Sequence, residues 1–346
     1  MTAPVDASPS FLIINVCRIG DTVMGTPAIR AVASAYPRSE ITCLGHPKRY
    51  QVLEHLPFIH AAGPISKNRT WWRGWLPGKR WDYALVYGYD RALVRYALRV
   101  ARHVVAFTQG DAQLDARLYR HVARPPLATT HGVDLALALP ELLGIPAAGR
   151  HLAYQVTHDE AAFARTLLDS RIGSRRPLIG LLLESFPTKA YRDWPLANFI
   201  ALARRIKAQY RDAHFLVFGG SLAPAKRAQL TTELGADVTI LAGELTLRQS
   251  AAVMQQLDLY VGVDTGPTHI AGALNIPMVA MYHCLHPSAG LKPLDRPGVY
   301  VIDHPAMGTA NCQATSSMAD VTVDQVFSRV VTALSESAAP AKEAVA

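Results

Sequence analysis

The stretch Leu259-Tyr-Val-Gly-Val-Asp264-Thr-Gly-Pro-Thr-His-Ile-Ala-Gly-Ala273 decides the fold class. An apolar run ends at an acidic residue, a glycine follows, and Pro267 opens a second apolar segment. Proline is favoured at the start of a helix because its missing N–H would be unpaired there in any case. The stretch therefore predicts a buried strand, a turn and a helix, which is the repeating unit of a parallel α/β sheet.

The same alternation continues on both sides of this stretch. In the C-terminal half, we expect strands at 178–183, 214–218, 238–241, 258–263 and 277–281, with helices at 195–209, 224–234, 246–256 and 267–274. In the N-terminal half, we expect strands at 11–17, 40–45, 83–87 and 103–107, a helix from an N-cap at Thr26 to Ala35, and a helix over 131–143. This pattern predicts an α/β protein of two Rossmann-like domains, whose parallel sheets face a central cleft and bind ligands at the carboxyl ends of their strands.

Composition agrees with two domains of ordinary size. The chain has 346 residues, of which 50% are hydrophobic, and its apolar runs are far shorter than the roughly 20 residues that span a bilayer. We place the domains at 1–150 and 151–320, with a helix near 158–170 in the connection, and a helix with a disordered Ala/Pro/Glu/Lys tail at 321–346. Residues 1–10 lack a basic region before the first apolar run, so we expect no signal peptide and a cytoplasmic protein.

The cysteines and the net charge constrain function less. Cys17, Cys43, Cys284 and Cys312 form no C-x-x-C pair, and we expect reduced, mostly buried thiols without a metal or a disulfide. A formal charge of +8 is compatible with nucleic acid, an anionic membrane surface or a phosphorylated substrate. Nucleic acid is disfavoured because no helix-turn-helix, RRM or finger pattern accompanies the charge.

The first strand leads into Arg18-Ile-Gly-Asp21-Thr-Val-Met-Gly-Thr-Pro27. Asp21 is thus predicted at the carboxyl end of a strand beside a helix start, where a carboxylate could act as a general base toward a hydroxyl group. The alternative is that Asp21 only caps the backbone N–H groups of the next helix. Neither the dinucleotide fingerprint G-x-G-x-x-G nor a G-x-x-x-x-G-K-[ST] P-loop occurs.

The turn that follows the strand 259–263 is a candidate anion site. Free N–H groups at the start of a helix point outward and suit a diphosphate. Asp264 could accept hydrogen bonds from sugar hydroxyls, while Thr265, Gly266 and Thr268 approach the phosphates. For Asp264 the alternative is a simple N-cap, and for His269 a packed, hydrogen-bonded core histidine.

Two further segments carry positive charge. Thr188 and Arg192 lie in a loop after the strand 178–183, where Arg192 could neutralise a phosphate or simply be solvated at the surface. The segment 48–81 combines basic residues with Trp71, Trp72, Trp75 and Trp81. It could bind a phosphorylated, lipid-anchored acceptor at the membrane surface, or be a solvated basic loop over a small aromatic core. The residues assigned to acceptor binding are Arg18, Lys48, Arg69, Arg73, Lys79 and Arg80.

Gly20-Asp21, then Arg192-Asp-Trp194-Pro195, then Asp264-Thr-Gly-Pro-Thr-His269 occur in this order, and the ordered set resembles the bacterial heptosyltransferases, glycosyltransferase family 9. The resemblance extends from about residue 11 to 331. It implies a GT-B fold and inverting transfer from ADP-L-glycero-D-manno-heptose to a growing lipopolysaccharide inner core, at the cytoplasmic face of the inner membrane. Asp21 matches the family's catalytic base. Arg192 falls where the family has a basic residue near the donor phosphates, and Asp264, Thr265 and Gly266 match its donor motif, with Thr188 a weaker match.

The resemblance also bears on metals and on alternatives. No D-x-D pair occurs in the sequence, so we expect no metal and no cofactor. The family commonly has Gly-Pro-Thr-x-Pro after the strand 277–281, whereas this chain has Tyr282-His-Cys-Leu-His286-Pro-Ser288, which leaves the sugar selectivity of this loop open. Two other functions remain: a GT-B nucleotide-sugar epimerase, and a transferase-like protein that only binds nucleotide sugars.

Overall fold

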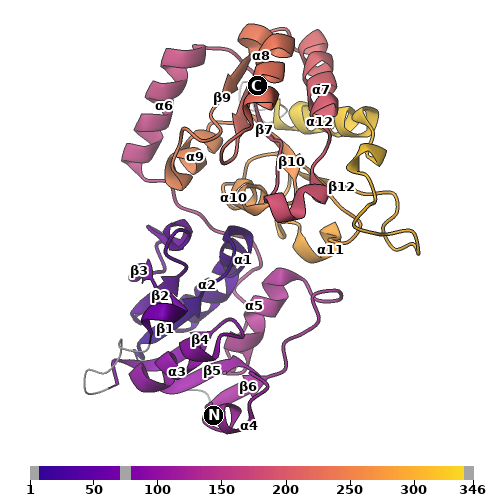
Figure 1. The fold of residues 1–346 in the computed structure, drawn as a ribbon. Coiled ribbons are helices and arrows are strands. Elements are labelled where there is room, and N and C mark those ends of the chain that lie inside the picture. The colour runs from indigo at the N-terminus through magenta and orange to yellow at the C-terminus, as the bar shows by residue number, and fades with distance from the viewer. Residues whose placement is uncertain (1–7, 71–78, 339–346) are drawn as a thin grey trace. The chain divides into compact units, whose positions relative to one another are not determined.

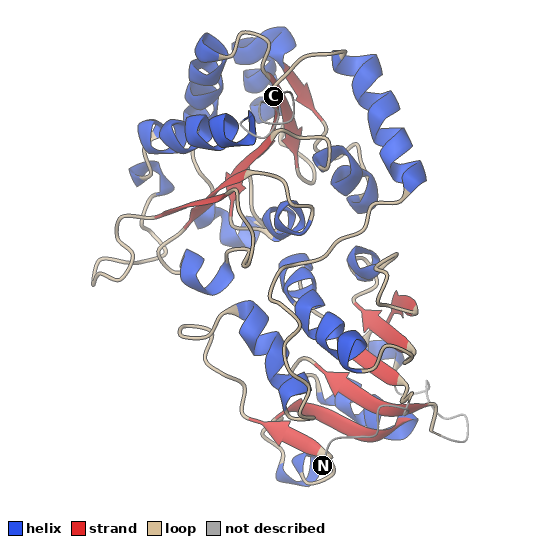
Figure 2. Ribbon diagram, turned by 180° about the vertical axis from the view of Figure 1, so that it is seen from behind, coloured by secondary structure: helices blue, strands red, loops and turns tan. Residues whose placement is uncertain are grey.

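Two compact units make up the chain, one from Met1 to Gln155 and one from Val156 to Ala346. A computed structural model describes residues 8–70 and 79–338. In each unit, helices lie on both faces of a sheet, as Figure 1 and Figure 2 show. The tail 339–346, which was expected to be disordered, lies outside the described residues, as do Arg73 and the tryptophans at 71, 72 and 75.

The first unit is built on a six-stranded sheet. Its strands are β1 (Phe11–Asn15), β2 (Ile41–Gly45), β3 (Ala61–Pro64), β4 (Trp81–Val86), β5 (Ala101–Phe107) and β6 (Arg120–Val122). Its helices and 3₁₀ turns are α1 (Ile19–Met24), α2 (Thr26–Ala35), η1 (Tyr50–Leu53), η2 (Lys67–Arg69), α3 (Arg91–Val100), α4 (Ala112–Asp115) and α5 (Gly132–Glu141). The strand order is β3-β2-β1-β4-β5-β6, and every pairing is parallel. The direction of strand addition therefore reverses between β1 and β4.

The second unit repeats this arrangement. Its strands are β7 (Leu178–Leu182), β8 (His214–Phe218), β9 (Val238–Ile240), β10 (Leu259–Val263), β11 (Met278–Tyr282) and β12 (Val299–Asp303). Its helices and 3₁₀ turns are α6 (His158–Ile172), η3 (Pro187–Arg192), α7 (Leu196–Gln209), α8 (Pro224–Leu234), η4 (Gly235–Asp237), α9 (Leu247–Met254), α10 (Gly266–Ala273), α11 (Ser288–Leu291), η5 (Met318–Asp320) and α12 (Val323–Ala338). The strand order is β9-β8-β7-β10-β11-β12, again wholly parallel. The predicted fold class, two Rossmann-like domains with parallel sheets, is confirmed.

The apolar composition of the central strands explains their position. Every residue of β7, β8, β10 and β11 is buried, as expected for parallel strands covered by helices on both faces. In the second core, the side chains of α7 and α12 pack on the sheet, and Val326, Val330 and Ala333 of α12 are buried there. Trp194 is also buried in this core, where its indole N–H donates to the Val321 carbonyl at 2.8 Å. That bond anchors the segment that follows η3.

Several local expectations need correction. The helix predicted from an N-cap at Thr26 has Gly25 as its N-cap, and a separate short helix, α1, precedes it. Thr26 instead donates its hydroxyl proton to the Val23 carbonyl at 2.7 Å and accepts from the Ala153 N–H at 2.9 Å, so it ties α2 to the end of the unit. The strands β3, β6 and β12 were not expected. They lie at sheet edges and are not fully buried, so their sequences lack the apolar runs that mark central strands.

The expectation that all cysteines are reduced is wrong for one pair. Cys284 and Cys312 form a disulfide with a Cα–Cα distance of 5.8 Å. Cys284 follows β11 and Cys312 follows β12, and these strands are parallel neighbours. The disulfide therefore joins the segments that follow two neighbouring strands, through residues that are 28 apart in the sequence. Cys17 and Cys43 are free thiols.

The helix α6 opens the second unit with a capping box. The Thr157 hydroxyl accepts from the Glu160 N–H at 3.2 Å, and the Glu160 carboxylate accepts from the Thr157 N–H at 2.9 Å. Glu160 also forms two 2.6 Å hydrogen bonds with Arg248 of α9, which fasten α6 onto α9. Over residues 8–70 and 79–338, no helix combines the length and the apolar character needed to cross a membrane.

Candidate active site

The second unit presents its site residues at the point where strand addition reverses. At such a point in a parallel sheet, the loops after two neighbouring strands run in opposite directions. They leave a crevice at the carboxyl ends of these strands. Here the two strands are β7 and β10, which pair with each other. The loop after β7 contains Thr188 and Arg192, and the turn after β10 contains Asp264, Thr265 and Gly266. Strand order thus brings together two of the segments that the sequence indicated.

A buried ion pair joins these two loops. Arg192 Nη1 lies 2.7 Å from Asp264 Oδ2 and 3.1 Å from the Asp264 carbonyl oxygen. The two side chains are 11% and 4% exposed, so the pair is largely withdrawn from water. Arg192 Nε is buried without a hydrogen-bond partner among the described residues, and the guanidinium therefore retains donor capacity.

His269 supports Asp264 from the other side. Its Nε2 lies 3.5 Å from Asp264 Oδ1, and both residues are 3% exposed. Burial alone would raise the pKa of the Asp264 carboxyl, but the hydrogen bond and charge of His269, together with the charge of Arg192, hold that pKa below its usual value. Asp264 is therefore an ionised, buried carboxylate, and the reading of Asp264 as a simple N-cap does not describe its contacts.

The helix α10 begins at Gly266, directly after this carboxylate. The Thr265 N–H donates to Thr268 Oγ1 at 3.4 Å, and the Thr268 hydroxyl donates to the Val263 carbonyl at 2.6 Å. Tyr260 Oη lies 3.0 Å from Thr268 Oγ1, so Thr268 is part of a buried network rather than a free phosphate ligand. Thr265 and Gly266 are only partly buried, and they remain the residues of this turn that a ligand can reach.

Other predicted and unpredicted residues surround this pair. Thr188 is exposed in η3. From the sequence, His283 and His286 stood out only as part of an unusual loop, and Tyr191 was not expected at the site. The structure links them: Tyr191 Oη lies 2.8 Å from His286 Nε2, and the Tyr191 ring contacts His283 edge-on, with ring centroids 4.9 Å apart. The signal in the sequence was the departure from the family pattern after β11.

His283 and His304 hold the loop after β11 in place, and neither ring has a nitrogen free to bind a metal. His283 Nδ1 accepts from the Leu285 N–H at 3.2 Å, and its Nε2 lies 3.0 Å from the Ser316 carbonyl oxygen. His304 repeats the pattern, accepting from the Ala306 N–H at 3.0 Å and facing the Ser317 carbonyl at 3.0 Å. Both nitrogens of each ring are therefore engaged. With the disulfide at Cys284, these bonds hold the loop after β11 against the segment after β12.

In the first unit, Asp21 also lies at the reversal point of its sheet. β1 pairs with both β2 and β4, and Asp21 follows β1 in the first turn of α1. Its side chain is exposed, and the N-cap position of α1 is Arg18, which makes no side-chain capping bond. Asp21 has no side-chain hydrogen bond within the described residues, so the capping alternative has no support.

Positive charge gathers near Asp21, from Arg49, which belongs to the basic segment 48–81, and from Arg124, which was not expected. Arg49 Nη1 donates to the Cys17 carbonyl at 3.0 Å. Burial, followed by the Asp21 charge, raises the pKa of the Cys17 thiol to about 12, whereas the charges of Arg49 and Arg124 act in the opposite sense. These four side chains are thus electrostatic neighbours at the carboxyl end of β1. Arg124 also packs over the Tyr89 ring, 5.3 Å from its centroid.

The predicted acceptor residues are not brought together. Arg18 and Lys48 are exposed at the carboxyl ends of β1 and β2, on the same edge as Asp21. Lys79 and Arg80 precede β4 and are bound at the end of α3, where Lys79 Nζ donates to the Leu98 carbonyl and the Arg80 N–H to the Val100 carbonyl. Because β1 and β4 are parallel, these two residues lie at the amino-terminal ends of the strands, whereas Asp21 lies at the carboxyl ends. Arg69 lies in η2, and Arg73 lies outside the described residues.

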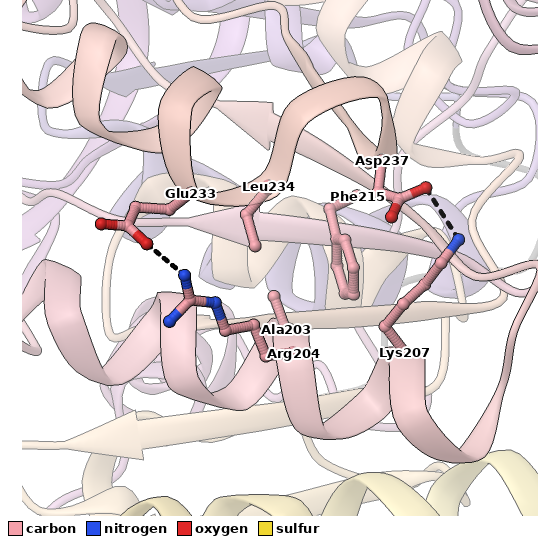
Figure 3. Close-up of a pocket in the computed structure, with 7 residues that line it drawn as sticks. All are labelled: Ala203, Arg204, Lys207, Phe215, Glu233, Leu234 and Asp237. Carbon is pink, nitrogen blue, oxygen red and sulfur yellow. Dashed lines mark hydrogen bonds and ion pairs between the residues drawn. The ribbon is translucent and has the colours of Figure 1, made fainter.

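A separate surface pocket in the second unit does not have the features of a donor site. Figure 3 shows its lining between α7, α8 and the start of β8: Ala203, Arg204, Lys207, Phe215, Glu233, Leu234 and Asp237. Arg204 pairs with Glu233, and Lys207 Nζ lies 2.8 Å from Asp237 Oδ1, so its charges are already balanced. The pocket lies at the amino-terminal ends of the strands, whereas Asp264 lies at their carboxyl ends.

Comparison with known proteins identifies the family. Residues 91–303, well over half of the chain, match the sequence profile of Glycosyltransferase family 9 (heptosyltransferase). The chain belongs to this family. It is therefore a glycosyltransferase, and the matched span includes η3, β10 and α10.

Relatives and solved structures agree with this assignment. The lipopolysaccharide core heptosyltransferase OpsX of Haemophilus influenzae is 25% identical in an alignment of 292 residues that covers 80% of this chain and 80% of the other. A family 9 glycosyltransferase from Veillonella parvula has a TM-score of 0.81 at 19% identity, covering 96% of this chain and 99% of the other. The ADP-heptose LPS heptosyltransferase II of E. coli has a TM-score of 0.77 at 20% identity, with 94% and 99% covered. At these identities the structural matches support the fold.

Proposed function

We propose that this family 9 glycosyltransferase moves a heptose from ADP-L-glycero-D-manno-heptose to a lipopolysaccharide inner-core acceptor, with inversion at the anomeric carbon. The observation that carries the proposal is the buried Arg192–Asp264 pair beside the start of α10, at the reversal point of the second sheet. This arrangement combines a cation, the Gly266 N–H at the start of α10 and a carboxylate, which are groups that suit a nucleotide sugar. The names of the relatives support heptose as the sugar and the lipopolysaccharide core as the acceptor.

In this proposal, the diphosphate is bound by Arg192 and by the Gly266 N–H at the start of α10. Both stabilise the negative charge that develops as ADP leaves. Asp264 holds Arg192 in place and offers Oδ1, near His269, to a sugar hydroxyl. Gly266 approaches the phosphates through its backbone N–H, Thr265 approaches them through its hydroxyl group, and Thr188 approaches them from η3. Thr268 and His269 act by holding this turn in shape.

Asp21 is the proposed general base. Its exposed carboxylate takes the proton from the acceptor hydroxyl, whose oxygen then attacks the anomeric carbon on the face opposite to the departing diphosphate. Because the leaving-group charge is met by Arg192 and the helix start, and because the sequence has no D-x-D pair, we infer that transfer requires no divalent metal.

Arg18, Lys48, Arg49 and Arg124 are the proposed contacts for an anionic acceptor. They lie near the carboxyl ends of β1 and β2, where Asp21 also lies. Their charge would attract a phosphorylated acceptor, and the acceptor's lipid anchor would bring the enzyme to the inner face of the membrane. Lys79 and Arg80 are poor candidates for direct contact with the acceptor because they lie at the amino-terminal ends of the strands.

The experiment is a transfer assay with ADP-heptose and truncated core acceptors, read by mass spectrometry. Asp21→Asn should lower kcat by about two to four orders of magnitude, the usual contribution of a general base, while ADP binding measured by calorimetry stays unchanged. Glu40→Gln, an exposed carboxylate before β2, is the matched control. An Asp21→Asn enzyme that retains more than about a tenth of kcat would exclude this role. Activity should also persist in EDTA; a loss that Mg²⁺ restores would contradict the metal-free mechanism.

A further inference from the structure

The loop after β11 meets the loop after β7 through a chain of three polar side chains. Lys189 Nζ donates to Tyr191 Oη at 3.4 Å, and Tyr191 Oη lies 2.8 Å from His286 Nε2. Lys189 and Tyr191 belong to η3, the element that ends in Arg192, whereas His286 follows β11. The bond between Tyr191 and His286 therefore connects residues 95 apart in the sequence.

Hydrogen-bond chemistry favours one direction for this chain. An ammonium group can only donate, so the Tyr191 oxygen accepts from Lys189, and this leaves the Tyr191 hydroxyl proton available for donation to His286 Nε2. His286 Nε2 is then an acceptor. A neutral imidazole carries one proton, and that proton must reside on Nδ1. No acceptor for this Nδ1–H occurs among the described residues, and His286 is only partly buried, so a ligand can reach it.

The surroundings of His286 keep the ring neutral and favour an anion nearby. Burial, then the charge of Arg192, lowers the pKa of His286 to about 4; Asp264 acts against this, while Lys189 and His283 add to it. These are the charged and titratable groups that face the ring from η3, from the turn after β10 and from its own loop. Two cations, Arg192 and Lys189, lie around one neutral N–H donor, and this combination suits a phosphate oxygen.

We propose that His286 is a further donor-binding residue, whose Nδ1–H donates to a diphosphate oxygen of the nucleotide sugar while Tyr191 and Lys189 hold the required tautomer. The inference rests on the proposed donor site and extends it to the loop where this chain departs from the family pattern. His286 binds the leaving group; Tyr191 is a positioning residue that acts through His286.

The test uses two amides that mimic different ring nitrogens. In His286→Asn the amide nitrogen can take the place of Nδ1, and in His286→Gln it can take only the place of Nε2. Since hydrogen bonds to charged groups are among the stronger ones, we expect His286→Gln to weaken ADP binding about 10-fold or more. The Kd of His286→Asn for ADP should stay within about threefold of the wild-type value. This is a free-energy change of less than half of that for a tenfold change in Kd.

Tyr191→Phe adds an independent readout. Without the hydroxyl, the two tautomers of His286 compete, and ADP affinity should fall about two- to fivefold, in proportion to the fraction that still carries the proton on Nδ1. His158→Gln is the control, because His158 is an exposed histidine at the start of α6 in the same unit. Calorimetry with ADP and with ADP-heptose gives the affinities, and transfer kinetics give KM and kcat separately.

Three outcomes would overturn the inference. If His286→Gln binds ADP as wild type does and His286→Asn does not, His286 is only a structural link to Tyr191. If ADP-heptose binding weakens while ADP binding does not, the contact is not to the diphosphate. Nitrogen NMR of the wild-type chain labelled in histidine provides a check independent of any variant's folding: the inference requires a protonated Nδ1, and a protonated Nε2 refutes it. Failure of wild type to bind ADP would instead refute the proposed function itself.

Discussion

Removing Arg192 should expose the energetic role of the buried pair. In Arg192→Ala, the side chain of Asp264, which is 4% exposed in wild type, loses its cation and keeps His269, at 3.5 Å, as its nearest basic neighbour. Breaking a buried ion pair by deleting one partner usually costs about 3–5 kcal/mol, because the remaining charge is unsolvated. We therefore expect the second unit of Arg192→Ala to lose about that much of its free energy of unfolding, together with its affinity for ADP.

The pH dependence follows from the sign of the pKa change. In wild type, the folded-state pKa of Asp264 lies below its usual value, so the carboxylate contributes stability above the unfolded-state pKa and loses it as pH falls through the folded value. Without Arg192, one of the groups that offset burial is lost and the pKa of Asp264 rises, so the ionised carboxylate contributes less to stability. The stability difference between wild type and Arg192→Ala should therefore be largest at neutral pH and should narrow below about pH 4, where an ordinary Asp becomes protonated.

Hydrogen exchange in increasing urea, read on peptides from β7 and β10, measures the second unit separately. The double variant Arg192→Ala/Asp264→Asn removes the unpaired charge and should recover part of the loss. Arg204→Ala is the control, because its partner Glu233 is 34% exposed and such surface pairs contribute less than about 1 kcal/mol. The reasoning is refuted if Arg192→Ala loses no more stability than Arg204→Ala and shows the same pH profile as wild type.

Two more outcomes are expected. The hydrogen bonds from Arg248, with a smaller contribution from those of Thr157, lower the pKa of Glu160 from 4.5 to about 2. This shift corresponds to at most about 3 kcal/mol of stability, which is present above pH 4.5 and is lost as pH falls toward 2. Glu160→Gln should remove it, and an unchanged acid-unfolding profile would contradict the assignment. Arg49→Ser and Arg124→Ser should raise acceptor KM and flatten its dependence on salt, whose Debye length is near 10 Å at 0.1 M, without changing ADP affinity. Lys79→Ser and Arg80→Ser are the controls, because these residues lie at the amino-terminal ends of the strands. An equal effect from them on acceptor KM would show that acceptor binding is not confined to the carboxyl ends.

The sequence alone was sufficient for the central architecture. The apolar runs that became β1, β7, β8, β10 and β11 were predicted close to their observed bounds. Pro267 correctly predicted the start of α10. These features are local: a buried strand needs an unbroken apolar run, and a helix start needs particular residues within one turn. The edge strands β3, β6 and β12 were missed because partly exposed strands do not need such runs.

Only the tertiary structure decided which side chains meet. The partners Arg192 and Asp264 are 72 residues apart, and Tyr191 and His286 are 95 apart. Each partner was visible in the sequence as a polar residue after a strand, but the pairing depends on β7 lying beside β10 and β10 beside β11. The parallel pairing of β1 and β4 placed Lys79 and Arg80 at the amino-terminal ends of the strands, opposite to Asp21, and the adjacency of β11 and β12 brings near each other the segments that the Cys284–Cys312 disulfide joins. Strand order and register are set by packing over the whole core, so local composition specifies the strands and their ends, whereas the contacts among those ends are fixed only when the sheet assembles.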